Sequence, residues 1–184
     1  MLWITCNVKK TRTVYLPSAQ FIFVCLCGIG RNGLEIIALT SGHSEWEAAK
    51  QYAAGCPWRG GAYLAEQMAH GAFEEWERVF IARENGKIVA FCNFTAKDEL
   101  AEEYDFTPFI GCVFVEAAYR GNRLSERLIG AVLAYAGEIG YQSVYIMSGE
   151  TGLYEKYGFS LLGDYRTAFG TTEQLFVKKT AAEP

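Results

Sequence analysis

The feature that most constrains the fold is a continuous apolar run, FIGCVFVE at 109–116, followed by a glycine-containing turn and an amphipathic stretch. An apolar run without polar alternation is typical of a central strand that is covered on both faces. A second run of strand length, SVYIMS, begins at Ser143. This strand, helix, strand order predicts a parallel pair with a right-handed connection over 109–147. The helix between the runs has one apolar face, which carries Leu124, Leu128, Val132, Tyr135 and Ile139.

Two helices are expected on the N-terminal side of this unit. Ser44 is followed three residues later by Glu47, which is the pattern of a capping box that opens a helix. The segment GCPWRGG at 55–61 ends that helix, and a second one is expected over 62–76, weakened near its end by Gly71. The apolar face of the second helix carries Leu64, Met68 and Ala72.

The remaining strands complete one mixed sheet. An Asn-Gly pair at 85–86 separates two β-rich runs within 78–94, and both residues of such a turn adopt positive φ, so we expect a hairpin. LEIIAL at 34–39 and TEQLFVKK at 172–179 are further strands. The sequence therefore predicts the α/β class: one domain over 34–184 with a mixed central sheet of about six to seven strands and helices on both faces.

Residues 1–33 are expected to be an N-terminal extension outside that domain. Basic residues within 9–12 precede an apolar run at 18–30, as they do in a signal peptide. This run is shorter than the roughly 20 apolar residues that a spanning helix needs. The favoured interpretations of residues 1–33 are a leader, an accessory strand, or translation that starts upstream of the true start. Export, and tethering to a membrane through 14–30, are disfavoured.

Composition limits the possible partners. The net charge is -4, the pI is near 5.3 and no dense basic block is present, so binding to nucleic acid is not expected. The two histidines and the cysteines lack the spacing of a zinc site, and we expect structural thiols of a reducing cytoplasm and no metal. The cysteines stand at 6, 25, 27, 56, 92 and 112.

The turn RGNRLS at 120–125 has the composition of an anion-binding site. The first N–H groups of a helix lack intrahelical partners and carry the positive end of the helix dipole. Gly121 permits positive φ, and Arg120 and Arg123 add positive charge. The turn matches neither the Walker loop nor the Rossmann fingerprint, and as a bare pattern a solvated surface turn is an equally good interpretation.

The wider segment VFVEAAYRGNRLSERLI at 113–129 resembles the pyrophosphate-binding segment of the GCN5-related N-acetyltransferases, with its [RQ]xxGx[GA] core. Arg120 stands at the first motif position, Ser125 at the last small one, and Val115 five residues before Arg120. Arg123 occupies the middle glycine position. If backbone N–H groups form the cradle, an arginine side chain that points outward is accommodated at this position. If the position requires backbone angles open only to glycine, an arginine is excluded.

A second segment, GLYEKYGF at 152–159, resembles the FYEKxGF signature of the same family. The resemblance implies that Tyr154 donates a proton to the departing thiolate of coenzyme A. A phenol with a pKa near 10 is a proton source at neutral pH. Packing of Tyr154 and Tyr157 as ordinary aromatic residues is the alternative. The resemblance covers roughly Leu34 to Lys178, because the order of the expected strands and helices is also that of the family.

The resemblance implies an N-acetyltransferase that uses acetyl-CoA as cosubstrate, with direct attack of an amine on the thioester. Glu116, beside the end of the fourth strand, is the expected general base, and Tyr154 is the expected general acid. The acceptor is expected to be a small-molecule or peptide amine, and a homodimer is possible because paired subunits are frequent in the family. The expected cofactor-binding residues are Val113, Phe114, Val115, Arg120, Gly121, Asn122, Arg123, Leu124, Ser125 and Tyr157.

Two further groups of residues bear on the acceptor. Acidic residues of the connection 97–108 are expected to be mostly solvated, but together they would attract a cationic amine. Three tryptophans could wall an acceptor pocket, although core packing is the commoner role. The acidic residues are Asp98, Glu99, Glu102, Glu103 and Asp105, and the tryptophans are Trp46, Trp58 and Trp76. An acyl-CoA-binding module without turnover is the competing hypothesis.

Overall fold

The computed structural model describes residues 33–71 and 73–180, so the expectations for residues 1–32 lie outside the described part. Seven strands form one sheet in the order β1-β2-β3-β4-β5-β7-β6. The strands are β1 Leu34–Leu39, β2 Arg78–Glu84, β3 Lys87–Thr95, β4 Phe109–Val115, β5 Ser143–Ser148, β6 Ser160–Arg166 and β7 Thr172–Lys179. The helices are α1 Trp46–Gly55, α2 Arg59–Ala69 and α3 Leu124–Glu138, with short 3-10 turns η1 Ala117–Tyr119 and η2 Glu155–Tyr157.

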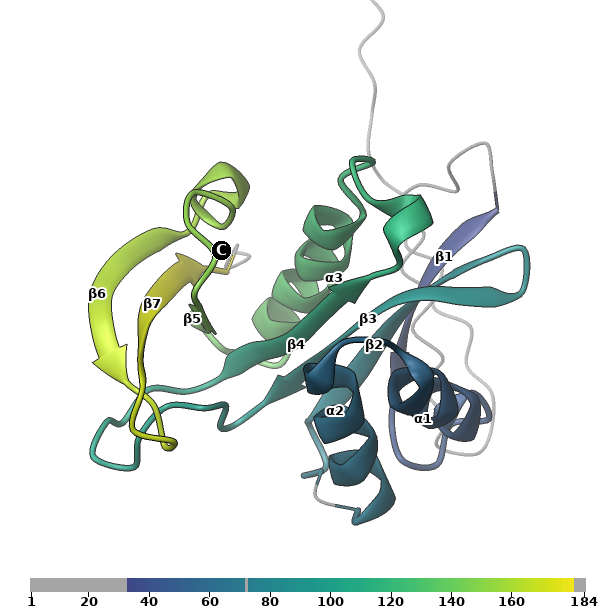
Figure 1. Cartoon of the computed structure of the whole chain (residues 1–184), viewed down its shortest axis with the longest axis horizontal. Coiled ribbons are helices and arrows are strands. Elements are labelled where there is room, and N and C mark those ends of the chain that lie inside the picture. The colour runs from purple at the N-terminus through teal and green to yellow at the C-terminus, as the bar shows by residue number, and fades with distance from the viewer. Residues whose placement is uncertain (1–32, 72, 181–184) are drawn as a thin grey trace, which may run out of the picture.

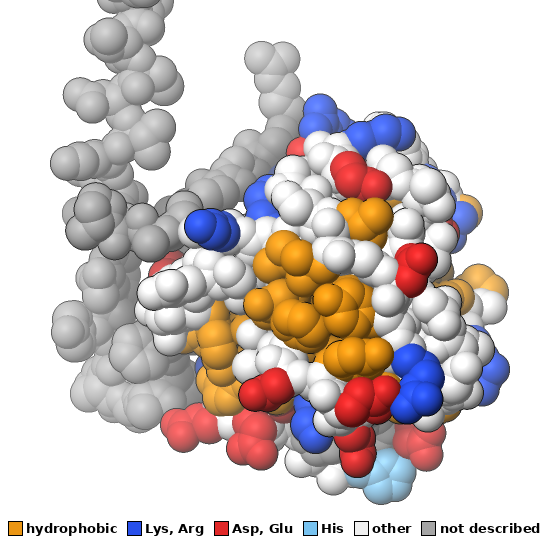
Figure 2. Space-filling model, turned by 90° about the vertical axis from the view of Figure 1, so that its left-hand side faces the viewer, with side chains coloured by type: hydrophobic (Ala, Val, Ile, Leu, Met, Phe, Trp, Pro, Cys, Tyr) orange, Lys and Arg blue, Asp and Glu red, His pale blue; other side chains and the backbone are white. Residues whose placement is uncertain are grey.

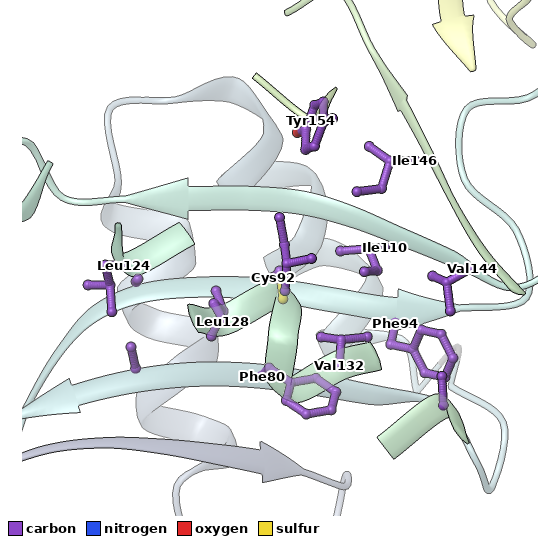
Figure 3. Packing of buried hydrophobic residues seen from close by; sticks show 14 of the residues in the cluster. Phe80, Cys92, Phe94, Ile110, Leu124, Leu128, Val132, Val144, Ile146 and Tyr154 are labelled. Carbon is purple, nitrogen blue, oxygen red and sulfur yellow. The ribbon is translucent and has the colours of Figure 1, made fainter. Parts of the chain in front are cut away.

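Helices cover both faces of the sheet, as the sequence predicted (Figure 1). On one face α3 packs over β2 to β5, and its buried residues Leu124, Leu128 and Val132 point at the sheet (Figure 3). On the other face α1 and α2 cover β1 to β4 and form a second core around Leu64 and Phe91. We call these the α3 face and the α1/α2 face.

The strand pairing agrees with the predicted mixed sheet. Strands β1 to β4 are antiparallel neighbours, and β4 lies parallel to β5. The turn between β2 and β3 has positive φ at Asn85 (51°) and Gly86 (79°), so the expected hairpin is confirmed.

The sequence did not predict β6 as a separate strand. Its apolar residues do not alternate with polar ones in the manner of a half-buried strand, because Leu161 and Leu162 are neighbours and both are nearly half exposed. β6 forms the edge of the sheet and pairs only with β7. Seen from this side, the molecule shows a gathering of apolar side chains on its surface (Figure 2).

Both expected N-terminal helices form, but their ends differ from the prediction. Ser44 does not cap α1; Glu45 is the N-cap, and its N–H donates to His43 Nδ1 at 3.0 Å. The helix α2 begins at Arg59 and ends at Ala69, well before residue 76, because Gly71 adopts a φ of 65° that ends helical geometry. No helix of the described residues is long and apolar enough to cross a membrane.

Candidate active site

The strands β4 and β5 are hydrogen-bonded neighbours only at one end. Their register contains a single pair, Phe109 opposite Tyr145, whereas β4 pairs with β3 from Phe109 to Val115. Beyond Phe109 the two strands separate (Figure 1). One edge of β4 is therefore left open to pair with an extended ligand along its second half.

A β-bulge distorts β4 at the point where its edge is open. Cys112 and Val113 together lie opposite Cys92, and Cys112 has a φ of 48°. The bulge changes which residues face which side: Val113 and Val115 pack on the α3 core, while Phe114 is buried in the α1/α2 core. The three strand residues among those predicted to bind the cofactor, Val113, Phe114 and Val115, thus all lie on the open strand, and no sequence pattern indicated the bulge.

The turn at 120–125 leads into the first turn of α3. Gly121 has a φ of 80°, and a Cβ on it would meet no atom within 4 Å. In the described part of the chain, the N–H groups of 121–125 donate to no backbone carbonyl. Arg120 Nε donates to the carbonyl of Val115 at 3.0 Å, so the guanidinium lies between this turn and the end of β4. Open N–H groups and a fixed cation form a suitable cradle for a diphosphate.

Arg123 adopts a left-handed conformation, which glycine favours but which is not open to glycine alone. Its φ and ψ are 55° and 27°, and it is the N-cap of α3. The side chain is 72% exposed and forms an ion pair with Glu126 through both Nε and Nη2, the latter at 2.7 Å from Oε1. The side chain points out of the turn, so the cradle stays open at the cost of backbone strain.

Tyr154 is buried beside the open edge of β4. Its ring packs on Phe176 at 5.5 Å and Phe159 at 6.1 Å between ring centroids, and it lies next to Ile146 of β5 in Figure 3. Burial raises the pKa of Tyr154 to about 12, although a hydrogen bond with Ser148 acts in the opposite direction. The phenol therefore stays protonated at neutral pH and is available as an acid.

The two segments that carry the family resemblance meet directly. The hydroxyl groups of Tyr157 and Ser125 are 2.7 Å apart, which joins η2 to the first turn of α3. Lys178 of β7 donates from Nζ to the carbonyl of Tyr157 and so fixes η2 on the sheet. Lys178 was not among the residues picked out from the sequence, because a lysine on a terminal strand gives no signal of this contact.

Glu116 follows β4 directly and lies on the side of α1. Its carboxylate accepts a hydrogen bond from the Tyr52 hydroxyl at 3.4 Å, and the residue is exposed. Burial, with the charge of Glu116 as the next contribution, raises the pKa of Tyr52. The structure leaves the predicted role of Glu116 as general base a prediction.

Of the five acidic residues in the connection before β4, Asp98 is the one placed over the sheet. Its carboxylate lies over Gly111 of β4, and its pKa is raised to about 7, mainly by burial and next by the charge of Glu99. Asn93 of β3, which pairs with Gly111, has its side-chain oxygen at the same place. The sequence did not single out Asn93, because a lone polar residue in an apolar strand has many explanations.

The three tryptophans have different positions. Trp46 and Trp76 are core residues that pack on Phe73 and Phe94. Trp58 is 42% exposed at the start of α2 and stacks on Phe114 at 6.3 Å, which leaves it the one of the three positioned to wall an acceptor site. Among residues 33–71 and 73–180 no group of His, Cys, Asp and Glu could hold a metal ion.

Comparisons with solved structures agree with this architecture. An aminoglycoside 6'-acetyltransferase type Ii matches with a TM-score of 0.61 and 15% identity, over 81% of this chain and 99% of that chain. An aminoglycoside 6'-N-acetyltransferase complexed with coenzyme A matches with a TM-score of 0.59 and 14% identity, over 81% of this chain and 98% of that chain. The GNAT family N-acetyltransferase YhbS from Escherichia coli, in complex with CoA, matches with a TM-score of 0.60 and 18% identity. The match covers 83% of this chain and 84% of that chain. These likenesses show a shared fold.

No curated protein sequence matches the chain significantly. The sequence profile described as "Acetyltransferase (GNAT) family" does match, over residues 40–159, a range that includes the turn at 120–125 and the segment at 152–159. That range covers most of the chain and both motif segments, and it confirms the resemblance and the enzyme class inferred from the sequence. The chain belongs to the acetyltransferase (GNAT) family.

Proposed function

We propose that this protein transfers the acetyl group of acetyl-CoA to an amine by direct attack of the amine nitrogen on the thioester carbonyl. The observation that carries the proposal is the hydrogen bond between Ser125 and Tyr157, because it brings the anion-binding turn and the segment of Tyr154 to one place. In this proposal the turn holds the pyrophosphate and Tyr154 is the acid for a thioester bound along the open edge of β4.

The cofactor residues follow from this arrangement. The N–H groups of 121–125 and the side chain of Arg120 would hold the pyrophosphate, and the open backbone of 113–115 would pair with the pantetheine arm. Leu124 starts α3 in the core and so fixes the direction of the N–H groups, while Asn122 closes the turn through its amide, which donates to the carbonyls of Tyr119 and Arg120.

Tyr154 is proposed to protonate the sulfur of coenzyme A as the carbon–sulfur bond breaks. Its raised pKa keeps the proton on the phenol until a strongly basic thiolate develops nearby. Coenzyme A structures of two similar proteins support acetyl-CoA as the donor. Amines of the aminoglycoside class are one candidate acceptor, because two similar structures are aminoglycoside acetyltransferases.

A Tyr154→Phe variant tests this proposal. We expect kcat to fall about 100-fold, because general acid catalysis typically contributes a factor of that order. Acetyl-CoA affinity, measured by calorimetry, should stay the same because the ring and its packing remain. The assay measures release of free thiol from acetyl-CoA against a broad panel of amines.

Tyr104→Phe is the matched control, because Tyr104 packs on Tyr165 on the far side of the sheet from η2 and lies outside the site described above. It should leave turnover and binding unchanged. A wild-type protein that binds acetyl-CoA but releases thiol with none of the amines would contradict the enzyme function and favour a binding module. A protein that does not bind acetyl-CoA would contradict the proposal entirely.

A further inference from the structure

Two oxygen atoms meet over Gly111 on the α1/α2 face of the sheet. Gly111 has no side chain, and a Cβ placed on it would lie 2.7 Å from Asn93 Oδ1 and 3.0 Å from Asp98 Oδ1. These atoms come from β3 and from the connection before β4, so they are not neighbours in sequence. The missing side chain allows the two oxygens to approach the backbone of β4 closely and to converge there.

Asn93 is the more informative of the two residues. It is 2% exposed, and its side-chain oxygen has no hydrogen-bond partner among the described residues. Buried amide oxygens are nearly always hydrogen-bonded, and an unpaired one costs free energy. The ionised carboxylate of Asp98, the form that prevails above pH 7, cannot supply the missing donor. A donor brought by a ligand would satisfy both oxygens at once.

The surroundings of Asp98 favour a positively charged donor. The groups that face it are Glu99 on its own connection, whose backbone also forms a hydrogen bond with it, Glu173 on β7, Tyr63 on α2, Cys112 on β4 and Tyr154 before η2. The charged groups in that set are carboxylates. An ammonium group carries both the N–H donors and the positive charge that this arrangement lacks.

Asp98 is coupled electrostatically to the proposed chemistry. Burial is the main cause of the raised pKa of Tyr154, the proposed acid, and of Tyr63, which is 41% exposed on α2, and the negative charge of Asp98 adds to the rise in both. Trp58, exposed at the start of α2, provides an apolar wall on that side.

Building on the proposed function, we propose that Asp98 is the general base of the acetyl transfer, and that it binds the ammonium group of the acceptor together with the side-chain oxygen of Asn93. Glu116 then has no part in proton transfer. The acceptor is a primary amine that enters protonated, and a second positive charge on it would be attracted by Glu99 and Glu173.

Protons and bonds balance in this scheme. The Asp98 carboxylate takes one proton from the ammonium, and the free lone pair forms the carbon–nitrogen bond at the thioester carbonyl. The carbon–sulfur bond then breaks, and the sulfur takes the Tyr154 proton. The nitrogen loses its second proton to the Tyr154 phenolate, and Asp98 releases its proton to solvent. One ammonium and one acetyl-CoA thus give one amide, one free thiol and one proton.

The pKa of Asp98 suits this task. Burial raises it to about 7, with Glu99 adding to the effect, so the carboxylate is available at neutral pH and basic enough to accept a proton. At lower pH the carboxyl is protonated and can neither bind the cation by charge nor accept its proton. We therefore expect kcat/KM to fall about tenfold per pH unit below pH 7 and to be level between pH 7 and the pKa of the amine.

The experiment compares pH profiles of wild type and Asp98→Asn with the fastest acceptor among 1,4-diaminobutane, an aminoglycoside and a peptide with a free N-terminus. At pH 7.5 the variant should lose about 100-fold in kcat/KM. The kcat/KM of the variant should have no level region and should rise tenfold per pH unit toward pH 10, because without the base only the free amine can react. Acetyl-CoA affinity should be unchanged.

Two comparison variants sharpen the result. Asp105→Asn removes an exposed carboxylate from the same connection and should retain the wild-type profile. Glu116→Gln should also retain the level region. The assignment of Asp98 would be overturned if Asp98→Asn kept the level region of the kcat/KM profile, or if Glu116→Gln lost it. Neither result would affect the proposed acetyl transfer.

A second measurement does not depend on turnover. The folded pKa of Asp98 lies above the ordinary value of 3.8, so the native state binds more protons than the unfolded state between about pH 4 and pH 7. The stability contributed by protonated Asp98 is full below pH 4 and is lost as pH rises through 7. Asp98→Asn should therefore raise the Tm at pH 8 by several degrees and leave it nearly unchanged at pH 4.5.

Binding of the amine can be read in the same melting experiment. At pH 8, saturating 1,4-diaminobutane should raise the Tm of wild type and not that of Asp98→Asn. If acetyl-CoA binds but no amine is turned over, the proposed function fails while this melting test still decides the cation site. Equal responses of both proteins to the diamine would overturn the site.

Discussion

The two sides of the open strand β4 are built in different ways. On the cofactor side, the turn at 120–125 offers backbone N–H groups, Arg120 adds a cation, and Tyr157 closes the site by one hydrogen bond. On the acceptor side, Asn93 and Asp98 offer side-chain oxygens over Gly111. One side thus presents donors and positive charge, and the other presents acceptors and negative charge.

This contrast suits the two substrates that the proposal requires. Acetyl-CoA carries a negative pyrophosphate, and the acceptor amine carries a positive charge at neutral pH. Positive charge at the turn 120–125 favours the pyrophosphate and repels the ammonium. Negative charge near Gly111 favours the ammonium and repels the pyrophosphate. In this proposal, charge directs each substrate to its own part of the site before any specific contact forms.

The largest expected effect comes from filling the acceptor side. Gly111→Ala places a methyl group 2.7 Å from Asn93 Oδ1 and 3.0 Å from Asp98 Oδ1, so both proposed ligand oxygens must move to accommodate it. We expect thiol release with amines to fall about 100-fold, a loss of the order that misplaced reacting groups produce. Acetyl-CoA affinity should change little, since its cradle is on the other side of the strand.

Gly130→Ala is the control for this change. Gly130 lies on α3, where a Cβ would meet no atom within 4 Å, so alanine should stabilise the helix by about 0.5–1 kcal/mol and leave turnover intact. A Gly111→Ala protein with wild-type turnover of every amine would contradict an acceptor site at Gly111. Parallel assays of turnover and calorimetric binding separate the two sides of β4.

A smaller effect is expected on the cofactor side. Arg120→Ala removes a cation beside the cradle and the hydrogen bond to the Val115 carbonyl. Acetyl-CoA affinity should fall about tenfold, as expected for one charge-assisted contact to a phosphate. The loss should shrink at high salt, since exposed charges are screened.

Lys87→Ala, at the exposed β2–β3 turn, removes the same charge at a distance from the cradle and should leave affinity unchanged. Equal affinities for wild type and Arg120→Ala, measured by titration calorimetry at low salt, would count against the proposed cradle. The amine KM should be the same in both variants.

The smallest effect is expected at Arg123. Glycine adopts its φ of 55° without strain, whereas alanine does not. Arg123→Gly should therefore melt at a higher temperature than Arg123→Ala, and both variants lose the same exposed ion pair with Glu126. Acetyl-CoA affinity should change less than about threefold in either variant.

Thermal melts of the two variants measure the backbone strain directly. The reverse order of melting temperatures would contradict the left-handed conformation of Arg123. A tenfold loss of affinity in Arg123→Gly would show that the side chain, which is 72% exposed, contacts the cofactor after all.

The turn proposed to bind acetyl-CoA could be picked out from the sequence because its parts are local. A glycine at 121, two arginines and the start of an apolar helix stand within one short segment, and backbone N–H groups need no particular side chain to bind an anion. The hairpin at 85–86 was predictable for the same reason. The helix ends were less accurate, because His43 rather than Ser44 satisfies the N–H of Glu45.

The acceptor side was not predictable in the same way. Asp98 was one of five acidic residues in a connection, and nothing in its spacing distinguished it from Asp105, which stays exposed. Asn93 was one polar residue in an apolar strand. Their meeting over Gly111 depends on the register of β3 against β4, which no local pattern specifies.

Local patterns were enough to predict the α/β class, the parallel strand–helix–strand unit and a turn with the composition of an anion site, because periodicity and backbone conformation are properties of short segments. Tertiary structure alone decided that β4 separates from β5 after one pair, that a bulge at Cys112 redirects its side chains, and that Asp98 is buried enough to raise its pKa. Burial and pairing depend on segments far apart in the chain, and only the folded sheet brings those segments together.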